Sequence, residues 1–317
     1  MTRAVGEFDV VDALPEAIVV LFAAVTHLAD PWFLFALLAA TYWFADARVA
    51  DAPRRSGATA IALVTCAFAA VALSKAAFAL PRPPGADPVA VTAADVPSWL
   101  PPLLAAWYEG QLVSDGFGFP SGHATGAVVA YGALALLVNG VSTRRRRIAV
   151  AGVLAGAVAI SRVVLEVHYL ADVVVGGVLG VVVLGIGLWL AGGRRRVEPP
   201  WRRIGPSNPE PLPVFLLAAG LSLVAMGVAA LGGHGDQVVE AGIGVGTGLG
   251  GAVGWLLVAG DEDGVPLRLA VPGLALTGGV WAAAFAVGGG PITTVVATGV
   301  AVGGVLAMPP LGERVRV

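Results

Sequence analysis

The chain is poor in charge and nearly devoid of cysteine. Asp, Glu, Lys and Arg make up only 13% of its 317 residues, whereas 57% of the residues are hydrophobic and the mean hydropathy is +0.84. These values lie outside the range of soluble globular domains. A single cysteine, Cys66, excludes an intrachain disulfide, and its apolar flanks suit a small core residue. We therefore expect an integral membrane protein that does not depend on disulfides.

Two other features are missing, and each narrows the class of membrane protein. The chain does not open with a basic leader, a short apolar run and a cleavage site, so we expect the first apolar segment to stay in the membrane. The apolar stretches do not alternate with polar residues as barrel strands do, and several approach or exceed the roughly 20 residues of a membrane-spanning helix. The net charge of −2 gives no argument for nucleic acid as a partner. The sequence predicts an all-α, polytopic transmembrane helical bundle.

The apolar stretches predict ten membrane spans. They lie near residues 14–29, 32–46, 57–80, 121–140, 148–165, 169–191, 213–232, 238–260, 267–287 and 291–308. Sixteen of the 19 Lys and Arg residues, Arg3 among them, fall in the two tails or in loops on one side of these spans. The positive-inside rule assigns that side to the cytoplasm. We therefore expect a multi-pass protein of the cell membrane with both termini inside.

An Arg- and Pro-rich stretch divides the chain. Residues 192–212 suit a semi-rigid cytoplasmic linker between a first membrane domain, 1–191, and a C-terminal bundle, 213–317. Four glycines of the C-terminal bundle recur at every fourth position: Gly242, Gly246, Gly250 and Gly254. Such a stripe predicts close helix packing rather than a ligand site.

Three cations remain on the opposite face, each in a short motif at the end of an apolar segment. The motifs read Lys75-x6-Arg82-Pro83, Pro120-Ser121-Gly122-His123 and Ser161-Arg162-x5-His168-x3-Asp172. Charged residues at the membrane are expensive and usually functional. Lys75, Arg82 and Arg162 keep their charge near neutral pH and can hold a phosphoryl group. The backbone N–H groups of Ser121 and Gly122, near a predicted helix start, can assist. The motifs predict a phosphate site at the outer face.

The two histidines of these motifs suit covalent transfer of phosphate. His168 and Asp172 are four residues apart, so on a helix they share a face, and the carboxylate can orient the imidazole with one lone pair free. This predicts His168 as the nucleophile. His123 is placed to protonate the departing oxygen and later to activate water. The chemistry requires neither a metal nor another cofactor.

In order and spacing, the three motifs resemble the signature motifs of the type 2 phosphatidic acid phosphatase superfamily. The resemblance covers roughly residues 14–191 and leaves the C-terminal bundle unexplained. It implies a six-helix core, a phosphohistidine intermediate on His168 and acid–base work by His123. It also implies phosphate contacts from Lys75, Arg82, Ser121, Gly122 and Arg162.

Glu166 departs from the family pattern, in which a small residue is common at this position. A carboxylate facing the pocket would repel phosphate and weaken activity. An offset of two residues from His168 turns a helical side chain by about 200°, which favours an outward orientation.

Some polar and aromatic residues lie outside the motifs. His27 and Trp32 are expected at the membrane interface. Glu240, with His234 and Asp236, is expected in a solvated loop that offers too few ligands for a metal. The segment 97–113 mixes apolar and polar residues, so it predicts either an interfacial helix or lid, or an inert surface segment.

These observations predict a metal-independent lipid phosphatase that cleaves a phosphomonoester or diphosphate at the outer face. The substrate is a phosphatidic-acid-like lipid or a polyprenyl diphosphate, and the motifs do not choose between them because they recognise phosphate alone. Phosphotransfer to an alcohol is a close variant of the same mechanism. A non-catalytic lipid transporter or membrane scaffold that retains a phosphate site is the alternative. The expected partners are membrane lipids, and the oligomeric state is left open.

Overall fold

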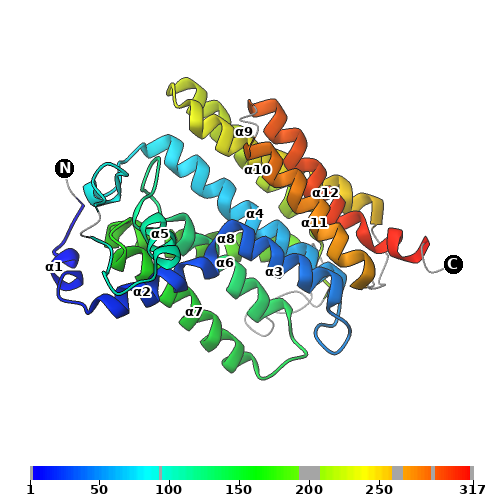
Figure 1. Cartoon of the computed structure of the whole chain (residues 1–317). Coiled ribbons are helices and arrows are strands. Elements are labelled where there is room, and N and C mark those ends of the chain that lie inside the picture. Colours follow the sequence, from blue (N-terminus) through cyan, green and yellow to red (C-terminus); the bar gives the residue numbers. More distant parts are fainter. Residues whose placement is uncertain (1–2, 93–94, 193–207, 259–266, 287–289, 315–317) are drawn as a thin grey trace.

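The computed structural model describes residues 3–92, 95–192, 208–258, 267–286 and 290–314, and these residues form helices and loops without strands (Figure 1). The helices are α1 (Glu7–Val11), α2 (Glu16–Val25), η1 (Thr26–Ala29), α3 (Pro31–Phe44), α4 (Pro53–Phe78), η2 (Pro84–Ala86), α5 (Pro102–Leu112), α6 (Gly122–Leu137), α7 (Arg144–Val164), α8 (Leu170–Ala191), α9 (Leu212–Leu231), α10 (Gly235–Val258), α11 (Leu267–Ala286) and α12 (Pro291–Arg314). The predicted all-α class is confirmed.

The membrane-spanning helices differ from the prediction near the N-terminus. Six described helices are long and apolar enough to cross a membrane, namely α4, α7, α8, α9, α10 and most of α12. The segments Glu16–Ala29 and Pro31–Phe44, predicted as two spans, form one pair bent by 51°, which makes a seventh span when the pair is counted as one. Pro31 starts a new helix at the bend, where its missing N–H is tolerated. The helix α6 is apolar but, at 16 residues, shorter, and α11, predicted as a span over 267–287, is not among the six.

Helix α4 lies at the centre of the molecule. It begins with Pro53 in its first turn, and most of its length is buried against α3, α6, α9 and α10 (Figure 1). The helix ends at Ala79, which adopts the left-handed conformation with φ 47°, and two prolines follow within four residues. The first motif, from Lys75 to Pro83, therefore lies at one end of the bundle.

The N-terminus lies at the end of the bundle that carries the motifs. The guanidinium of Arg3 reaches the Asp172 side chain and the Pro81 carbonyl oxygen. The bent α2–α3 pair runs from there to the opposite end, where Trp43 donates to a carbonyl of α12. The chain termini therefore lie at opposite ends (Figure 1). The prediction that Arg3 shares a face with the Arg144–Arg147 run was wrong, because Arg3 contacts Asp172 and Pro81 at the motif end, whereas the run begins α7 at the other end.

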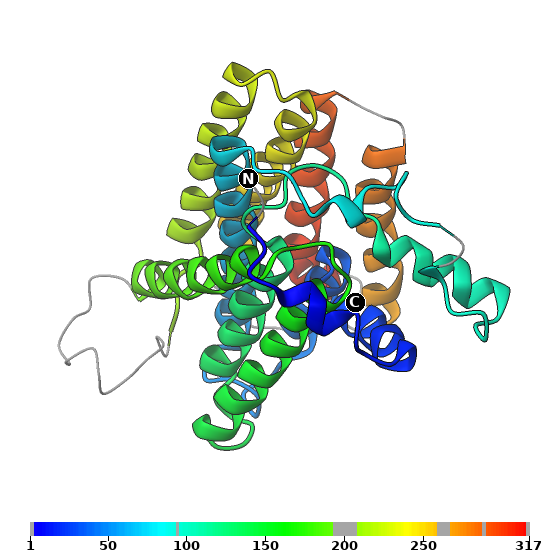
Figure 2. The ribbon, with the colours of Figure 1, turned by 90° about the vertical axis from the view of Figure 1, so that its left-hand side faces the viewer.

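The C-terminal helices pack directly on the first domain. Helices α9 and α10 lie against α4 (Figure 2). One hydrophobic core joins α3, α4, α6, α7 and α8 to α9–α12. The glycine stripe of α10 faces α12, since a Cβ on Gly250 would collide with the Gly299 carbonyl oxygen and one on Gly246 with that of Val295. The predicted close packing is confirmed. Most of the predicted linker, residues 193–207, lies outside the described residues.

Candidate active site

Arg82 reaches across the motif end of the bundle to His168. Its Nη1 donates to His168 Nε2 (3.0 Å) and to the Val167 carbonyl oxygen (3.1 Å), while Nε donates to the Asp115 carbonyl oxygen (2.9 Å). Gly118 permits this position, because a Cβ there would lie 3.0 Å from Arg82 Cγ. Burial lowers the pKa of Arg82, but nearby carboxylates oppose the shift, so the guanidinium stays charged.

His168 and Asp172 lie side by side, but not on one helix face as their spacing suggested, because His168 precedes the start of α8 at Leu170. His168 sits in the connection between α7 and α8, where its N–H donates to the Arg162 carbonyl oxygen (3.2 Å) and only 2% of the residue is exposed. Asp172, in the first turn of α8, accepts the Tyr169 N–H (3.1 Å). Its Oδ2 lies 3.6 Å from His168 Nδ1, which is longer than a hydrogen bond.

The surroundings of His168 define its protonation state. Because Arg82 donates to Nε2, this nitrogen carries the lone pair, and the proton of the neutral ring is on Nδ1, facing Asp172. Burial lowers the pKa of His168 to about 3, and the positive charges of Arg82 and Arg162 add to the shift while Asp172 opposes it. The ring is therefore neutral near pH 7, with its lone pair toward a guanidinium.

Arg3 is a member of the site that sequence reasoning missed. Its Nε donates to Asp172 Oδ1 (2.9 Å) and its Nη2 to the Pro81 carbonyl oxygen (2.6 Å). The guanidinium carbon also lies 4.8 Å from the centre of the Tyr169 ring. Arg3 thereby holds the carboxylate that faces His168. No local pattern marks this residue, which stands alone in a tail.

Arg162 is a buried cation with a free donor. It is 5% exposed, and its Nη1 donates to Thr26 Oγ1 (2.6 Å), while its buried Nε has no hydrogen-bond partner among the described residues. The charges of Arg162 and Arg82 act on both His123 and His168, so the two arginines flank the two histidines. A buried cation with an unsatisfied donor is costly unless an anion accepts the free hydrogen bond and balances the charge. This arrangement can bind an anion.

His123 belongs to a chain of polar groups that the sequence did not reveal. Its Nε2 lies 3.0 Å from Asp30 Oδ1, and Asp30 Oδ2 lies 2.6 Å from His27 Nδ1. Trp107 Nε1 donates to His27 Nε2 (2.9 Å), so a neutral His27 carries its proton on Nδ1 and donates it to Asp30. His27 is therefore more than an isolated interfacial residue. The available signal was a carboxylate next to Pro31 between two apolar stretches.

Ser121 serves as the cap of α6. Its Oγ accepts the Ala124 N–H (3.4 Å), and its own N–H donates to the Asp172 carbonyl oxygen (3.0 Å). The prediction that the Ser121 N–H contacts phosphate was therefore wrong, because this N–H already donates a hydrogen bond that joins α6 to α8. Gly122, the first residue of α6, leaves its N–H at the helix N-terminus.

Lys75 pairs with the C-terminal bundle. Its Nζ lies 3.2 Å from Glu240 Oε1 on α10. The prediction of Glu240 in a solvated loop was wrong, because α10 already begins at Gly235 and packs against α4. The charge of Glu240 also acts on Arg82, so one carboxylate lies near both cations of the first motif.

Glu166 faces the outer loops, which is the orientation that we favoured. It follows the end of α7 with φ 53°, and its Oε2 lies 3.6 Å from the position of a Cβ on Gly85. Burial raises the pKa of Glu166, and the charges of Asp12 and Asp95 add to this rise.

The segment 97–113 contains a helix, α5, as one of its two interpretations required. Leu103 and Leu104 on this helix are exposed, whereas Tyr108 is buried and Trp107 bonds to His27. One face of α5 thus contacts the network that holds His123.

Fold and site together define a helical membrane protein with a buried, cationic site around two histidines. Residues 55–196 match the family model described as the PAP2 superfamily, and this segment runs from the start of α4 to just beyond α8. The segment 55–196, which contains all three motifs, belongs to the type 2 phosphatidic acid phosphatase superfamily. No curated protein and no solved structure shows detectable similarity to the chain. Membership indicates phosphatase activity on lipid-like phosphoesters.

Proposed function

We propose that the protein is a lipid phosphatase that hydrolyses a phosphomonoester or diphosphate through a phosphohistidine on His168, without a metal ion. The substrate is a phosphatidic-acid-like lipid or a polyprenyl diphosphate. The observation that carries the proposal is the pair of arginines near the two histidines, half-buried Arg82 and buried Arg162, of which Arg82 donates to the lone pair of His168.

The first step forms a bond between His168 and phosphorus. His168 Nε2 attacks the phosphorus atom as the bond from phosphorus to the lipid oxygen breaks. Arg82 leaves Nε2 and donates to an equatorial oxygen of the phosphoryl group, and the free Nε of Arg162 donates to another. The Nδ1 proton of His168, facing Asp172, stabilises the positive charge that the ring acquires.

The second histidine handles the protons of both steps. His123 in its protonated form gives a proton to the departing lipid oxygen, and the Asp30 carboxylate beside Nε2 orients the ring for this transfer. Neutral His123 then takes a proton from a water molecule that attacks the phosphorus atom. The bond between phosphorus and nitrogen breaks, which releases inorganic phosphate and restores His168.

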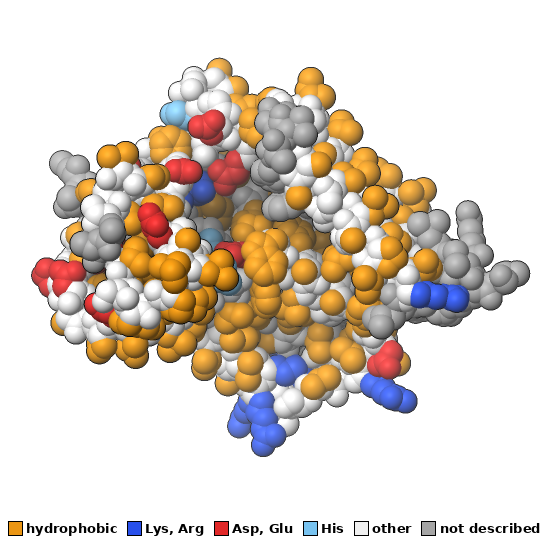
Figure 3. Space-filling view, viewed as in Figure 1, with side chains coloured by type: hydrophobic (Ala, Val, Ile, Leu, Met, Phe, Trp, Pro, Cys, Tyr) orange, Lys and Arg blue, Asp and Glu red, His pale blue; other side chains and the backbone are white. Residues whose placement is uncertain are grey.

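The extracytoplasmic location of the site rests on charge. The run Arg144–Arg147 begins α7 at the end opposite the motifs, and basic side chains lie along the bottom and the right-hand side of Figure 3. The positive-inside rule assigns that end to the cytoplasm and the site to the other face of the cell membrane.

The test is release of inorganic phosphate by the purified full-length protein in detergent. Phosphatidic acid and undecaprenyl diphosphate are offered separately, each with EDTA, to the parent protein, to His168→Ala and to His234→Ala. His234 packs edge-to-face with Phe117 and has no assigned role, so its variant is the matched control. We expect release in EDTA from the parent and His234→Ala, and at least a thousandfold loss in His168→Ala.

A labelled intermediate separates this mechanism from others. Substrate carrying ³²P in the transferred phosphoryl group should leave an acid-labile, alkali-stable label on the parent protein and none on His168→Ala. Activity that survives in His168→Ala, or that EDTA abolishes, contradicts the proposal. Binding of lipid phosphates without turnover by folded protein favours the transporter or scaffold.

A further inference from the structure

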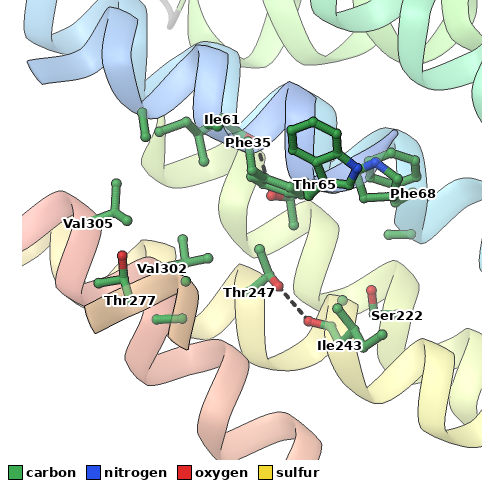
Figure 4. A pocket seen from close by; sticks show the side chains of 18 of the residues that line it. Phe35, Ile61, Thr65, Phe68, Ser222, Ile243, Thr247, Thr277, Val302 and Val305 are labelled. Atoms are coloured by element: carbon green, nitrogen blue, oxygen red, sulfur yellow. Dashed lines mark hydrogen bonds between the residues drawn. The ribbon is translucent and has the colours of Figure 1, made fainter. Parts of the chain in front are cut away.

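An apolar cavity opens beside the site, between the two halves of the molecule. It has a volume of about 460 Å³ and lies between α3 and α4 on one wall and α10, α11 and α12 on the other (Figure 4). Glu240 is the only charged residue in its lining. The hydroxyls of Thr65, Thr247 and Thr277 donate to carbonyls of their own helices. Apart from Glu240 and the hydroxyl of Ser222, which has no hydrogen-bond partner among the described residues, the walls are therefore effectively hydrocarbon.

The polar end of the cavity belongs to the candidate active site. Glu240 lines the cavity and pairs with Lys75. Trp32 also lines it, and its Nε1 donates to Asp30 Oδ2 (3.0 Å), the carboxylate that holds His123. In Figure 3, a hollow with an apolar floor has acidic, basic and histidine side chains at its rim. The cavity thus connects a hydrocarbon wall to groups that act on phosphate.

The depth of the cavity matches one leaflet of a bilayer. Its lining on α4 runs from Ala72 to Ile61, a separation of 11 residues. At 1.5 Å per residue this spans about 16 Å, roughly half of a hydrocarbon core of about 30 Å. A lipid with its phosphate at the motif end can lay a chain along the whole of this length. The volume also lies in the usual range for ligand pockets.

We propose, resting on the function proposed above, that this cavity binds the hydrocarbon chain of the lipid phosphate while Arg82 and Arg162 hold the phosphate. Helices α10–α12 then form half of the substrate site. A lipid chain is as apolar in the bilayer as in the cavity, so its entry gains little from the hydrophobic effect. The shape of the cavity therefore matters most. It orients the lipid chain, and lipids whose chains fit it should be hydrolysed with a higher kcat/KM.

Two adjacent glycines of α11 provide the test. Gly278 lines the cavity and Gly279 does not, and a Cβ at either position meets nothing within 4 Å. Gly278→Phe places a ring in the cavity, and Gly279→Phe makes the same change outside it. We expect Gly278→Phe to lower kcat/KM for long-chain phosphatidic acid about tenfold or more. Hydrolysis of p-nitrophenyl phosphate, which has no chain, should match that of the parent. Gly279→Phe should leave both activities unchanged.

A direct binding measurement separates failure of this proposal from failure of the proposed function. Phosphatidic acid with a diazirine in its acyl chain should crosslink to α4, α11 or α12 of the parent and of Gly279→Phe, and several-fold less to Gly278→Phe. If the parent hydrolyses no phosphoester, the proposed function fails while this labelling still reports chain binding. Absence of labelling at the cavity, or equal labelling and equal kcat/KM in the two variants, overturns the cavity proposal.

Discussion

His168 is held between a cation and an anion, and both act through its ring nitrogens. Arg82 donates to Nε2 from one side, while Asp172 faces Nδ1 from the other at 3.6 Å. Arg3 in turn holds Asp172. The hydrogen bond from Arg82 to His168 Nε2 must break before the lone pair on Nε2 can react. Binding of the substrate phosphate to Arg82 breaks this bond, so the same step binds the anion and frees the nucleophile.

The burial of His168 predicts that its ring stays neutral in acid. An ordinary imidazole has a pKa near 6.5, whereas burial lowers the pKa of His168 to about 3. The unfolded chain therefore binds the proton first, and the stability contributed by neutral His168 is present above pH 6.5 and is lost as pH falls from there toward 3. In ¹⁵N-histidine NMR spectra, the His168 signal should remain that of a neutral ring at pH 5.

Assignment is practical because the chain has four histidines. The signal missing from His168→Asn identifies the residue, and His234→Asn provides a second assignment. Protonation of His168 between pH 6 and 7 would contradict the burial described here.

Replacing Asp30 should impair only the proton transfer by His123. Asp30→Asn removes the charge beside His123 but keeps its shape, so we expect kcat to fall about a hundredfold for a lipid alkoxide leaving group. The p-nitrophenolate group leaves without needing a proton. Formation of the phosphoenzyme from p-nitrophenyl phosphate should therefore change by less than threefold.

A double variant distinguishes a positioning role from general damage. If Asp30 acts through His123, adding Asp30→Asn to His123→Ala should cost little more activity. Equal losses with both leaving groups, or fully additive losses in the double variant, would assign Asp30 to folding alone.

The sequence located the residues that belong to motifs and missed those that join them from elsewhere. Arg82, His168 and Asp172 were found because their motifs sit at the ends of predicted helices. Asp30 escaped because a helix break looks like an ordinary loop between spans. Glu240 escaped because its partner lies 165 positions away, on a helix that no local pattern pairs with α4.

At the level of elements, the end of α7 is under backbone strain. Glu166 has φ 53°, and its N–H donates to the Val163 carbonyl oxygen (2.9 Å), at the position after a helix where glycine is favoured. Glu166→Gly should stabilise the protein by about 1 kcal/mol and raise its Tm in detergent. Since the carboxylate faces the outer loops, KM should change by less than twofold.

The matched control is Glu166→Ala, which also removes the charge but keeps a Cβ. Its Tm should stay near that of the parent. An equal gain from both variants would assign the effect to repulsion from Asp12 and Asp95, and a fall in KM would show that Glu166 opposes phosphate.

Apolar patterns identified the helices but not how they are joined. The glycine stripe of α10 correctly indicated its close contact with α12, because small residues at helical spacing have few other causes. The bend at Pro31 was not foreseen. Two short apolar stretches separated by a proline read equally well as two spans or as one broken span.

At the scale of the whole molecule, the first domain and the C-terminal helices depend on each other. Tyr42 Oη donates to the Leu306 carbonyl oxygen (2.9 Å) at one end, and Lys75 pairs with Glu240 near the other. The C-terminal bundle therefore contacts the end of α3 through α12, and it packs on α4 through α9 and α10. It is placed to complete the site rather than to act as a separate unit.

The single crossing of the α2–α3 pair predicts that the N-terminus faces the same side as the active site. Cys66 is buried and is the only native cysteine, so introduced cysteines can be labelled selectively in intact cells. Val5, Val89 and Val141 are exposed in loops or tails at 75%, 90% and 52%. An impermeant maleimide should label Val5→Cys and Val89→Cys in intact cells, and Val141→Cys only after lysis, while the parent gives the background. Labelling of Val5→Cys together with Val141→Cys would instead place the N-terminus with the Arg144–Arg147 run, and would require α2 and α3 to cross separately.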